Sequence, residues 1–439
     1  MWIGTCLGAW IAGCAEPVSP DPPVFDGIRS LAWDGADGLV AGWDPVGGIE
    51  RYEVVVETPD GGAVASVEVD GDTATIDGLP DGEYTVRVDP GARTLAQYVG
   101  ANRLVLRSFT RIRGIGSVWG DGDLVVLGGR SSGASFRVYD LSDPRAPVLL
   151  HTEVGSGFTK EVKLGDDLLF TQGECGCGTR EGPEWEAYDK VGVRIWDLAD
   201  PSSPELVGTI GDPVSVVHNL WYQDGWLYVT DYEADGVRIY DVSEPAVPRE
   251  VWSWVPSEGF VHDQVVVRDR LYVSWWKGLT VFDVADPTAP VEIGTFTGLV
   301  PALHNAWPTD DDRYVYTTSE IPGGGLSILD FADPSAPERV GDVEGTVPAS
   351  SVHNVAIRDG FAYTAWYAEG VVVHDLSDPL HPREVGRYDT AHHDGAETDP
   401  AEPFSGAWGV WPFGEHLVVA DSLRGMFVFD RFPEIVTAE

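Results

Sequence analysis

Short apolar stretches alternate with turn residues along most of the chain, and this pattern repeats. From about residue 101 onward the sequence is self-similar every 42–57 residues. In the clearest repeat, period-two stretches cover 217–221, 226–229, 237–240 and 249–252, with turn residues between them. Alternation at period two, interrupted by such turns, predicts antiparallel strands. Four short strands in a repeat of about 45 residues predict the blade of a β-propeller.

Each full repeat ends its third strand with an aspartate, followed by a proline-containing turn. The last strand residue before that aspartate is Tyr139, Trp196, Tyr240, Phe282, Leu329 or His374, and a degenerate seventh copy has Phe429. Because proline presets φ and aspartate bonds the backbone, we interpret these aspartates as turn residues. The copies predict seven blades within 101–439. We expect residues 104–109 to complete the last blade, which would hide the open sheet edges.

This combination of apolar strand, aspartate and Asp-Pro turn resembles the LVIVD-repeat propellers, which are bacterial and archaeal surface proteins. The resemblance covers residues 101–439 and implies the propeller fold and an exported location. It says almost nothing about chemistry, because function resides in sites placed on a fold.

A smaller all-β unit is expected at residues 24–93, where strand and turn signals alternate. Trp43 stands on an early strand, and Leu79 and Tyr84 precede a late one. This arrangement resembles a fibronectin type III domain and implies a small β-sandwich whose tryptophan fills the core. The expected fold class is therefore all-β, with a seven-bladed propeller of four-stranded blades preceded by a sandwich that acts as a spacer.

The first residues are typical of an export signal. Residues 1–14 are apolar and end in small residues, as a signal segment does. The run from Ile11 to Cys14 resembles a bacterial lipobox, which implies lipidation of Cys14, although no Lys or Arg precedes the apolar stretch. Residues 15–23 are rich in proline and predict a stiff linker. We expect an outer-membrane or cell-surface lipoprotein facing the periplasm or the exterior; a cytosolic chain with an apolar leader is the alternative.

Charge and composition exclude several classes. The formal net charge of −43 argues against nucleic acid as a partner, since phosphate binding needs a basic surface. The same charge argues against docking on anionic lipid, so membrane contact is expected only through the lipid anchor. An aromatic content of 11% indicates that most of the chain folds.

Histidine recurs at one aligned position in four consecutive blades. Counting back from the second strand of each blade gives His218, His262, His304 and His353, whereas the other three blades have Ile115, Lys160 and Trp408. Neutral imidazole is a common ligand for transition metals. The pattern is similar to the four-histidine iron site of carotenoid-cleaving oxygenases and to the axis histidines of copper propellers of the methanethiol oxidase family. That resemblance implies one axial metal, Fe or Cu. The alternative is that the imidazoles stack between blades and bond loop backbone.

A polar residue follows each of these histidines. The four residues are Asn219, Asp263, Asn305 and Asn354. A ligating histidine usually needs a partner for its second ring nitrogen. Because neighbouring residues on a strand face opposite sides, we expect each polar residue to orient the histidine of the next blade rather than its own. Lys160 and Glu161 are expected at the same rim, and Trp275, Trp276, Trp366 and Trp408 near the same face.

Two further loops are expected on that face. One contains Cys175 and Cys177, which could form a disulfide or redox pair, hold a soft metal or remain free thiols. The other contains His392, His393 and Asp394, which could cover or join a site, or belong to a solvated acidic loop.

A calcium loop is a weaker hypothesis. Asp231, Glu233 and Asp235 stand at alternate positions, as calcium ligands do, but the full EF-hand pattern is missing.

Two functions are consistent with these patterns. The first is a binding module that takes a protein, a glycan or a small ligand on its histidine-bearing top face. The alternative is a metal-dependent oxidoreductase of the cell envelope with a four-histidine axial site. Neither a Walker loop, a dinucleotide fingerprint nor His-Glu-x-x-His occurs in the sequence, so NAD chemistry has no support.

Overall fold

The computed structural model describes the strands between residues 28 and 99 and much of the chain that follows. Beyond those strands, the described residues are 104, 106–129, 134–154, 159–173, 192–211, 216–298, 303–347, 349–391 and 404–431. The expected signal segment, the linker and Cys14 lie outside them. All elements described are β-strands, which agrees with the all-β fold class. No helix among the described residues is long and apolar enough to cross a membrane.

The N-terminal part forms two antiparallel sheets, ordered β1-β2-β5 and β4-β3-β6-β7. Their strands are β1 (Ile28–Trp33), β2 (Leu39–Trp43), β3 (Arg51–Glu57), β4 (Ala63–Asp70), β5 (Thr73–Ile76), β6 (Tyr84–Asp89) and β7 (Leu95–Val99). In β5 every second side chain is buried, and in β3 Val54 and Val56 are buried as well. One face of each of these strands is therefore covered. The last strand lies beyond residue 93, where the sequence pattern placed the end of this unit.

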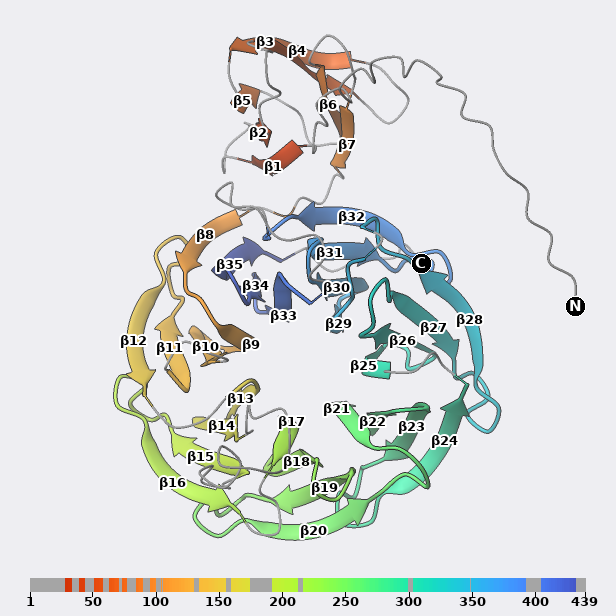
Figure 1. Ribbon diagram of the computed structural model, residues 1–439. Helices are drawn as coiled ribbons and strands as arrows, with labels where there is room; N and C mark the ends of the chain where they lie inside the picture. The colour runs from red at the N-terminus through yellow and green to blue at the C-terminus, as the bar shows by residue number, and fades with distance from the viewer. Residues whose placement is uncertain are drawn as a thin grey trace, which may run out of the picture.

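Seven four-stranded antiparallel sheets follow, arranged as blades around an axis (Figure 1). Blade 1 comprises β9 (Ile115–Asp121), β10 (Leu124–Gly129), β11 (Phe136–Asp140) and β12 (Val148–Glu153). Blade 2 comprises β13 (Val162–Gly165), β14 (Leu168–Gln172), β15 (Val193–Asp197) and β16 (Glu205–Ile210). Blade 3 comprises β17 (Val217–Gln223), β18 (Trp226–Asp231), β19 (Gly236–Asp241) and β20 (Arg249–Trp254). Blades 4 and 5 comprise β21 (Val261–Val267), β22 (Arg270–Trp275), β23 (Gly278–Asp283), β24 (Val291–Thr297); and β25 (Leu303–Pro308), β26 (Tyr314–Ser319), β27 (Leu326–Asp330), β28 (Glu338–Val343). Blade 6 comprises β29 (Val355–Arg358), β30 (Phe361–Trp366), β31 (Gly370–Asp375) and β32 (Arg383–Tyr388). The first strand of each blade is innermost (Figure 1). With blade 7, described next, the sheets confirm the prediction of seven four-stranded blades.

The last blade is closed by a strand from the other end of the propeller. Blade 7 combines β33 (Ala407–Phe413), β34 (His416–Asp421) and β35 (Gly425–Asp430) with β8 (Leu106–Arg111). Phe109 pairs with Phe427 in this contact, and Arg107 donates a hydrogen bond from Nε to Asp430 at 2.6 Å. The predicted ring closure is therefore confirmed, and it pairs the edge that β35 would otherwise leave open.

The repeated aspartates shape the turns after the third strands. In blade 1, Asp140 accepts the backbone N–H of Ser142 at 2.8 Å, and Asp143 accepts that of Arg145 at 3.0 Å. The same two-residue bond recurs at the aspartates of blades 2 to 6. These bonds stabilise the charged carboxylate, and in blade 3 a serine and an arginine bond lower the pKa of Asp241 to about 2. The aspartates act as turn residues, as the sequence predicts.

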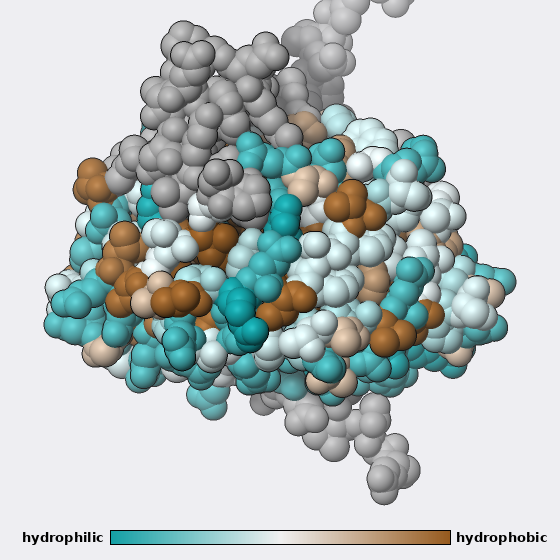
Figure 2. Space-filling model, turned by 90° about the horizontal axis from the view of Figure 1, so that it is seen from below, coloured by the Kyte–Doolittle hydropathy of each residue, from teal (hydrophilic) through white to brown (hydrophobic). Residues whose placement is uncertain are grey.

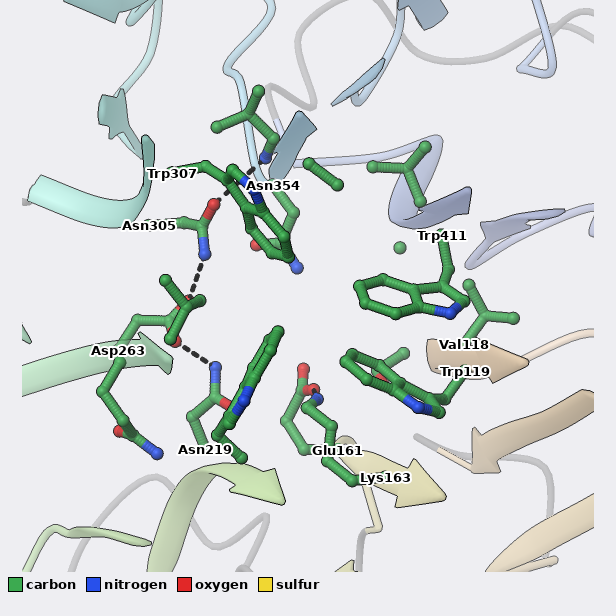
Figure 3. A pocket seen from close by; sticks show the side chains of 18 residues that line it. Val118, Trp119, Glu161, Lys163, Asn219, Asp263, Asn305, Trp307, Asn354 and Trp411 are labelled. Atoms are coloured by element: carbon green, nitrogen blue, oxygen red, sulfur yellow. Dashed lines mark hydrogen bonds and ion pairs between the residues drawn. The ribbon is translucent and has the colours of Figure 1, made fainter. Parts of the chain in front are cut away.

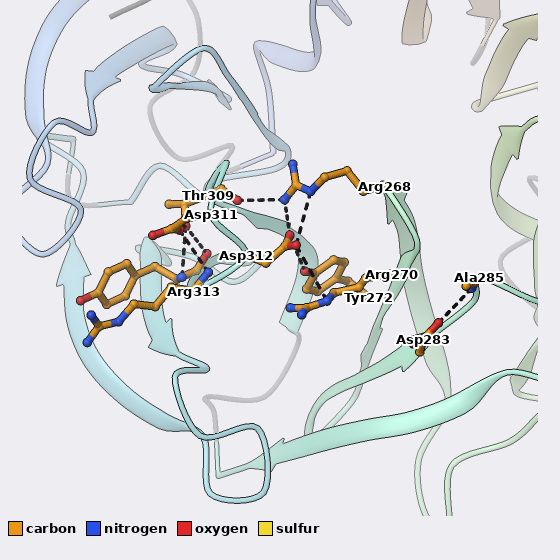
Figure 4. Close-up of polar contacts among 10 residues, drawn as sticks. Arg268, Arg270, Tyr272, Asp283, Ala285, Thr309, Asp311, Asp312 and Arg313 are labelled. Carbon is orange, nitrogen blue, oxygen red and sulfur yellow. Dashed lines mark hydrogen bonds and ion pairs between the residues drawn. The ribbon is translucent and has the colours of Figure 1, made fainter. Parts of the chain in front are cut away.

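Polar contacts fasten neighbouring blades at the loops that join their first two strands. Arg268 of blade 4 donates to the backbone oxygen of Thr309 in blade 5 at 3.1 Å, and it also bonds the Asp312 carboxylate (Figure 4). Tyr272 of blade 4 donates to the same carboxylate at 3.3 Å. One aspartate thus receives two donors from the preceding blade and links the two sheets.

The surface carries no single large apolar area in the view of Figure 2, where hydrophobic residues form small separate groups among hydrophilic ones. Val148 and Val291, on the outer strands β12 and β24, are examples of exposed apolar side chains. Scattered exposed apolar residues are normal for a folded surface. In this view the exposed apolar residues therefore do not mark a binding surface.

Candidate functional site

In blades 3, 4 and 5 the innermost strand is irregular where the sequence places histidine. The pairing register shifts between Val217 and Leu220 in β17 and between Val261 and Asp263 in β21, and similar shifts occur in β9, β25 and β33. Such a β-bulge adds a residue to one strand and changes the direction of the side chains around it. The regular two-sided alternation is therefore interrupted between a histidine and the residue that follows it.

The four predicted histidines lie side by side. The ring centroids of His218 and His262 are 4.4 Å apart, those of His262 and His304 are 4.4 Å apart, and those of His304 and His353 are 4.2 Å apart. Trp408 of blade 7 extends the series, 4.2 Å from His353. We call the four imidazoles the histidine row. They are in contact across blades, as the stacking alternative requires, and they also gather ring nitrogens in one place, as a metal site requires.

A carboxylate that sequence reasoning did not single out joins the histidine row. Glu320 directly follows β26, and its Oε2 lies 3.4 Å from Nε2 of His304. Its Oε1 lies 3.9 Å from Nε2 of His353 and accepts a hydrogen bond from the hydroxyl of Tyr367. Ligand atoms of His262, His304 and Glu320 all lie within 4.8 Å of one another.

Two imidazoles of the row, those of His262 and His304, have lowered pKa values. Burial is the largest cause that lowers the pKa of His262 well below its usual value, and the neighbouring histidines lower it further. Burial also lowers the pKa of His304, although the Glu320 carboxylate opposes this. In His353, Nδ1 lies 2.7 Å from the backbone oxygen of Trp408. A carbonyl oxygen can only accept, so Nδ1 carries a proton.

A polar layer follows the histidine row along the axis (Figure 3). The Asp263 carboxylate accepts one hydrogen bond from the amide of Asn219 and another from Asn305 at 3.0 Å. Beside them Lys163 donates to Glu161 at 3.0 Å, and both side chains are buried. Burial, with the Glu161 charge next, raises the pKa of Asp263 to about 7. The expected partners of the histidines thus bond one another.

A small cavity lies within this layer. Its volume is about 40 Å³, and its lining includes Glu161, Lys163, Asp263 and the amide side chains of the layer. That volume is enough for at least one water molecule, and the polar lining offers it partners.

Four tryptophans close the axis one step further along the inner strands. They are Trp119, Trp221, Trp307 and Trp411, from alternate blades 1, 3, 5 and 7, and we call them the tryptophan floor. The rings of Trp119 and Trp411 stack with centroids 3.5 Å apart, and Trp221 meets Trp119 edge-on at 5.1 Å. Trp221 stands three residues after a row histidine, as Trp307 does. The sequence analysis did not predict this layer, although the spacing of the tryptophans from the histidines was a usable signal.

Aromatic rings continue the histidine row at both ends. At one end Tyr232 stacks on the first imidazole with centroids 4.4 Å apart, Phe260 lies 5.9 Å from Tyr232, and Trp276 lies 5.4 Å from Phe260. At the other end Tyr367 lies 5.5 Å from the last imidazole, and Phe404 lies 5.7 Å from Tyr367. Trp276 is 39% exposed and Phe404 is 40% exposed, so apolar rings reach the surface on both sides of the row.

The other predicted site residues are distributed as follows. Lys160 is half-buried, and its backbone oxygen accepts the N–H of Ser117 at 2.7 Å. Asn354 lines the axial cavity. The remaining predicted residues lie outside the described part of the chain; they are Cys175, Cys177, His392, His393 and Asp394.

One of the carboxylates considered for calcium, that of Asp231, is engaged by its own blade. Asp231 is buried, and its Oδ1 accepts the backbone N–H of Glu233 at 2.9 Å. Its Oδ2 accepts Nε of Arg238 at 2.7 Å. The carboxylate of this residue therefore shapes a turn and pairs with an arginine.

Comparison with known proteins supports the repeats and the fold. Residues 259–298 and 349–390, which correspond to blades 4 and 6, match the LVIVD repeat. No curated protein sequence matches the chain. A protein from Lactobacillus plantarum is similar in structure, with a TM-score of 0.51 and 13% identity over 68% of this chain and 89% of that one. A functionally unknown protein from Desulfotomaculum acetoxidans DSM 771 has a TM-score of 0.50 and 10% identity over 76% and 94% of the two chains. At these identities the likeness concerns the fold alone.

Proposed function

We propose that this chain is a binding module whose ligand site is the end of the propeller axis that carries the histidine row. The single observation that carries the proposal is the layered axis. The imidazoles, two buried and two partly buried, lie at one level, a bonded polar layer at the next, and the tryptophan floor beyond it. Such an axis forms a cup rather than a through-channel. Exposed aromatic rings at its edge, Trp276 and Phe404, offer apolar faces to a glycan, a small organic molecule or a protein side chain.

The place of the module in the cell is part of the same proposal. The apolar segment 1–14 and the lipobox-like run ending at Cys14 support export and lipid anchoring. The two antiparallel sheets of three and four strands in the N-terminal part support a fibronectin type III-like sandwich that acts as a spacer. The propeller would then stand away from the membrane with its cup accessible from the periplasm or the exterior.

The binding proposal is tested by screening the full chain against a glycan array and a library of small organic compounds. Trp276→Ala removes one exposed aromatic face and is expected to weaken any hit about tenfold, which is a loss of about 1.4 kcal/mol. Val291→Ala, on the outer strand of the same blade, is the matched control and should leave affinity unchanged. A hit that binds Trp276→Ala as tightly as the unaltered chain would place the ligand elsewhere.

A second candidate function is a metal-dependent oxidoreductase of the cell envelope. The observation that favours it is the meeting of two imidazoles and one carboxylate within 4.8 Å. The test is elemental analysis of the full chain, purified without chelator or histidine tag, beside a variant with alanine at all four row histidines. About one transition metal per chain that is lost in the variant supports this function. If the chain holds no metal even after reconstitution, the metal-dependent function is rejected.

A further inference from the structure

We propose that the axis holds one divalent transition metal ion through three ligands, His262, His304 and Glu320, rather than through four histidines. The proposal rests on the second candidate function above, because it concerns the same metal centre. Two imidazoles with one carboxylate form the ligand set that leaves positions open on iron(II) and related ions.

The distances fit this set. Metal–nitrogen and metal–oxygen bonds are about 2.1 Å long, so ligand atoms on adjacent positions of an octahedral ion are about 3 Å apart. Oε2 of Glu320 lies 3.4 Å from Nε2 of His304, and the three ligand atoms all lie within 4.8 Å of one another. Shifts of at most about one ångström therefore bring them to bonding positions.

Glu320 is held in the orientation that a ligand needs. The hydroxyl of Tyr367, a fully buried side chain, donates to Oε1. The other oxygen, Oε2, faces Nε2 of His304 at 3.4 Å. A hydrogen bond to one carboxylate oxygen that leaves the second free is a common arrangement around metal ligands. Tyr367 is therefore a positioning residue in this proposal.

The two outer histidines of the row are engaged in other contacts. The ring of His218 lies flat on Tyr232, with an angle of 5° between the planes. His353 uses Nδ1 for the backbone oxygen of Trp408, and its Nε2 lies 3.9 Å from the carboxylate oxygen that Tyr367 bonds. These contacts place both imidazoles beside the three-ligand group, where they can shield it and contact what occupies the open positions.

Charge is consistent with a divalent ion. Two neutral imidazoles and one carboxylate contribute a charge of −1, so a divalent ion leaves the centre with about one positive charge for an anionic ligand or substrate to offset. The nearby Lys160 would be attracted to the same ligand class, which makes a small anion or an anionic organic molecule the expected occupant of the open positions.

The test measures cobalt(II) affinity of the full chain by calorimetry and by the visible absorption of the bound ion. Glu320→Gln keeps the shape of a partly exposed side chain and is expected to weaken Co²⁺ binding more than a hundredfold, with His304→Asn similar. Tyr367→Phe should weaken it about tenfold, as loss of a partner to a ligand does. His218→Ala is the decisive comparison and should change the affinity less than threefold.

The outcomes separate this inference from the function on which it rests. If His218→Ala weakens Co²⁺ as strongly as Glu320→Gln, the centre is a four-histidine one; the inference falls and the metal-dependent function stands. If Glu320→Gln binds Co²⁺ as the unaltered chain does, the inference falls in the same way. If the unaltered chain binds no more Co²⁺ than the variant that lacks all four histidines, both fall, and the binding-module proposal is judged by its own screen.

Discussion

His374 provides a quantitative test of the packing between the propeller strands. It lies on β31 and is 4% exposed, and its Nδ1 has no hydrogen-bond partner among the described residues. Burial lowers the pKa of His374 to about 4; Glu384 and Glu369 oppose this and Arg387 adds to it. The equivalent position in the other blades is apolar or aromatic. The fold therefore tolerates an uncharged ring here, and a charged one is costly.

The sign and size of the effect follow from linkage. The folded-state pKa is depressed, so below pH 6.5 the unfolded chain binds the proton more readily than the folded one does. The stability that depends on neutral His374 is present above pH 6.5 and is lost progressively as the pH falls towards 4. A shift from 6.5 to about 4 corresponds to about 3 kcal/mol in full, of which about 2 kcal/mol is lost between pH 7 and pH 5.

The perturbation is His374→Phe, which places in blade 6 the residue that blades 4 and 7 have at this position. Urea unfolding followed by tryptophan fluorescence at pH 7 and pH 5 gives the pH dependence of both proteins. The unaltered chain should lose about 2 kcal/mol more than the variant between the two pH values. All other titrating groups are shared, so they cancel in the difference. Equal losses in both proteins would refute the claim that this imidazole is buried neutral.

Three further predictions concern the axis, a buried ion pair and the ring closure. Trp411→Ala removes a ring that stacks on Trp119 and should cost about 3–5 kcal/mol in urea unfolding. Glu369→Ala removes the buried partner of Arg387, which keeps its bonds to Glu384, and calorimetry should show a loss of about 1.5–3 kcal/mol. Deletion of residues 104–111 removes β8 and leaves β7 in place, and light scattering should detect association through the exposed edge of β35.

Each of these three predictions has a control or a contradicting outcome. Trp276→Ala truncates a half-exposed ring and should cost under about 1 kcal/mol, so equal losses at Trp276 and Trp411 would contradict the tryptophan floor. Glu338→Ala, on an exposed part of β28, should be near neutral. A deletion variant that stays monomeric would show that β8 is dispensable for closure.

The blades could be predicted from the sequence because their signals are local and repeated. Period-two alternation marks the strands, and each Asp-Pro turn is shaped by a bond that reaches only two residues along the chain, such as Asp140 to Ser142. Closure by residues 104–109 followed from their likeness to other fourth strands. The aligned histidines also met as predicted, since equal positions on adjacent blades have to be neighbours at the axis.

The parts that could not be predicted depend on irregular geometry. β-bulges interrupt the alternation around His218 and His262, so the rule of strict alternation did not predict the bond between Asn219 and Asp263. Glu320 lies in a loop of blade 5, sixteen residues after His304, and only the pairing of β25 with β26 brings the two together. Neither the β-bulges nor the contact between Glu320 and His304 changes the hydrophobic periodicity of the sequence.

The repeat itself supplies an argument that the histidine row serves a ligand rather than the fold. Blade 1 has Ile115 at the aligned position and blade 7 has Trp408, yet both build the same four-stranded sheet around the same axis. A blade therefore does not need an imidazole there. Four adjacent polar rings at one end of the axis, two of them buried and two partly buried, reduce the apolar area that an isoleucine would bury, at about 25 cal/mol per Å². A chain that carries this cost in four consecutive blades, with Glu320 and Tyr367 arranged beside them, has the structure expected of a binding centre.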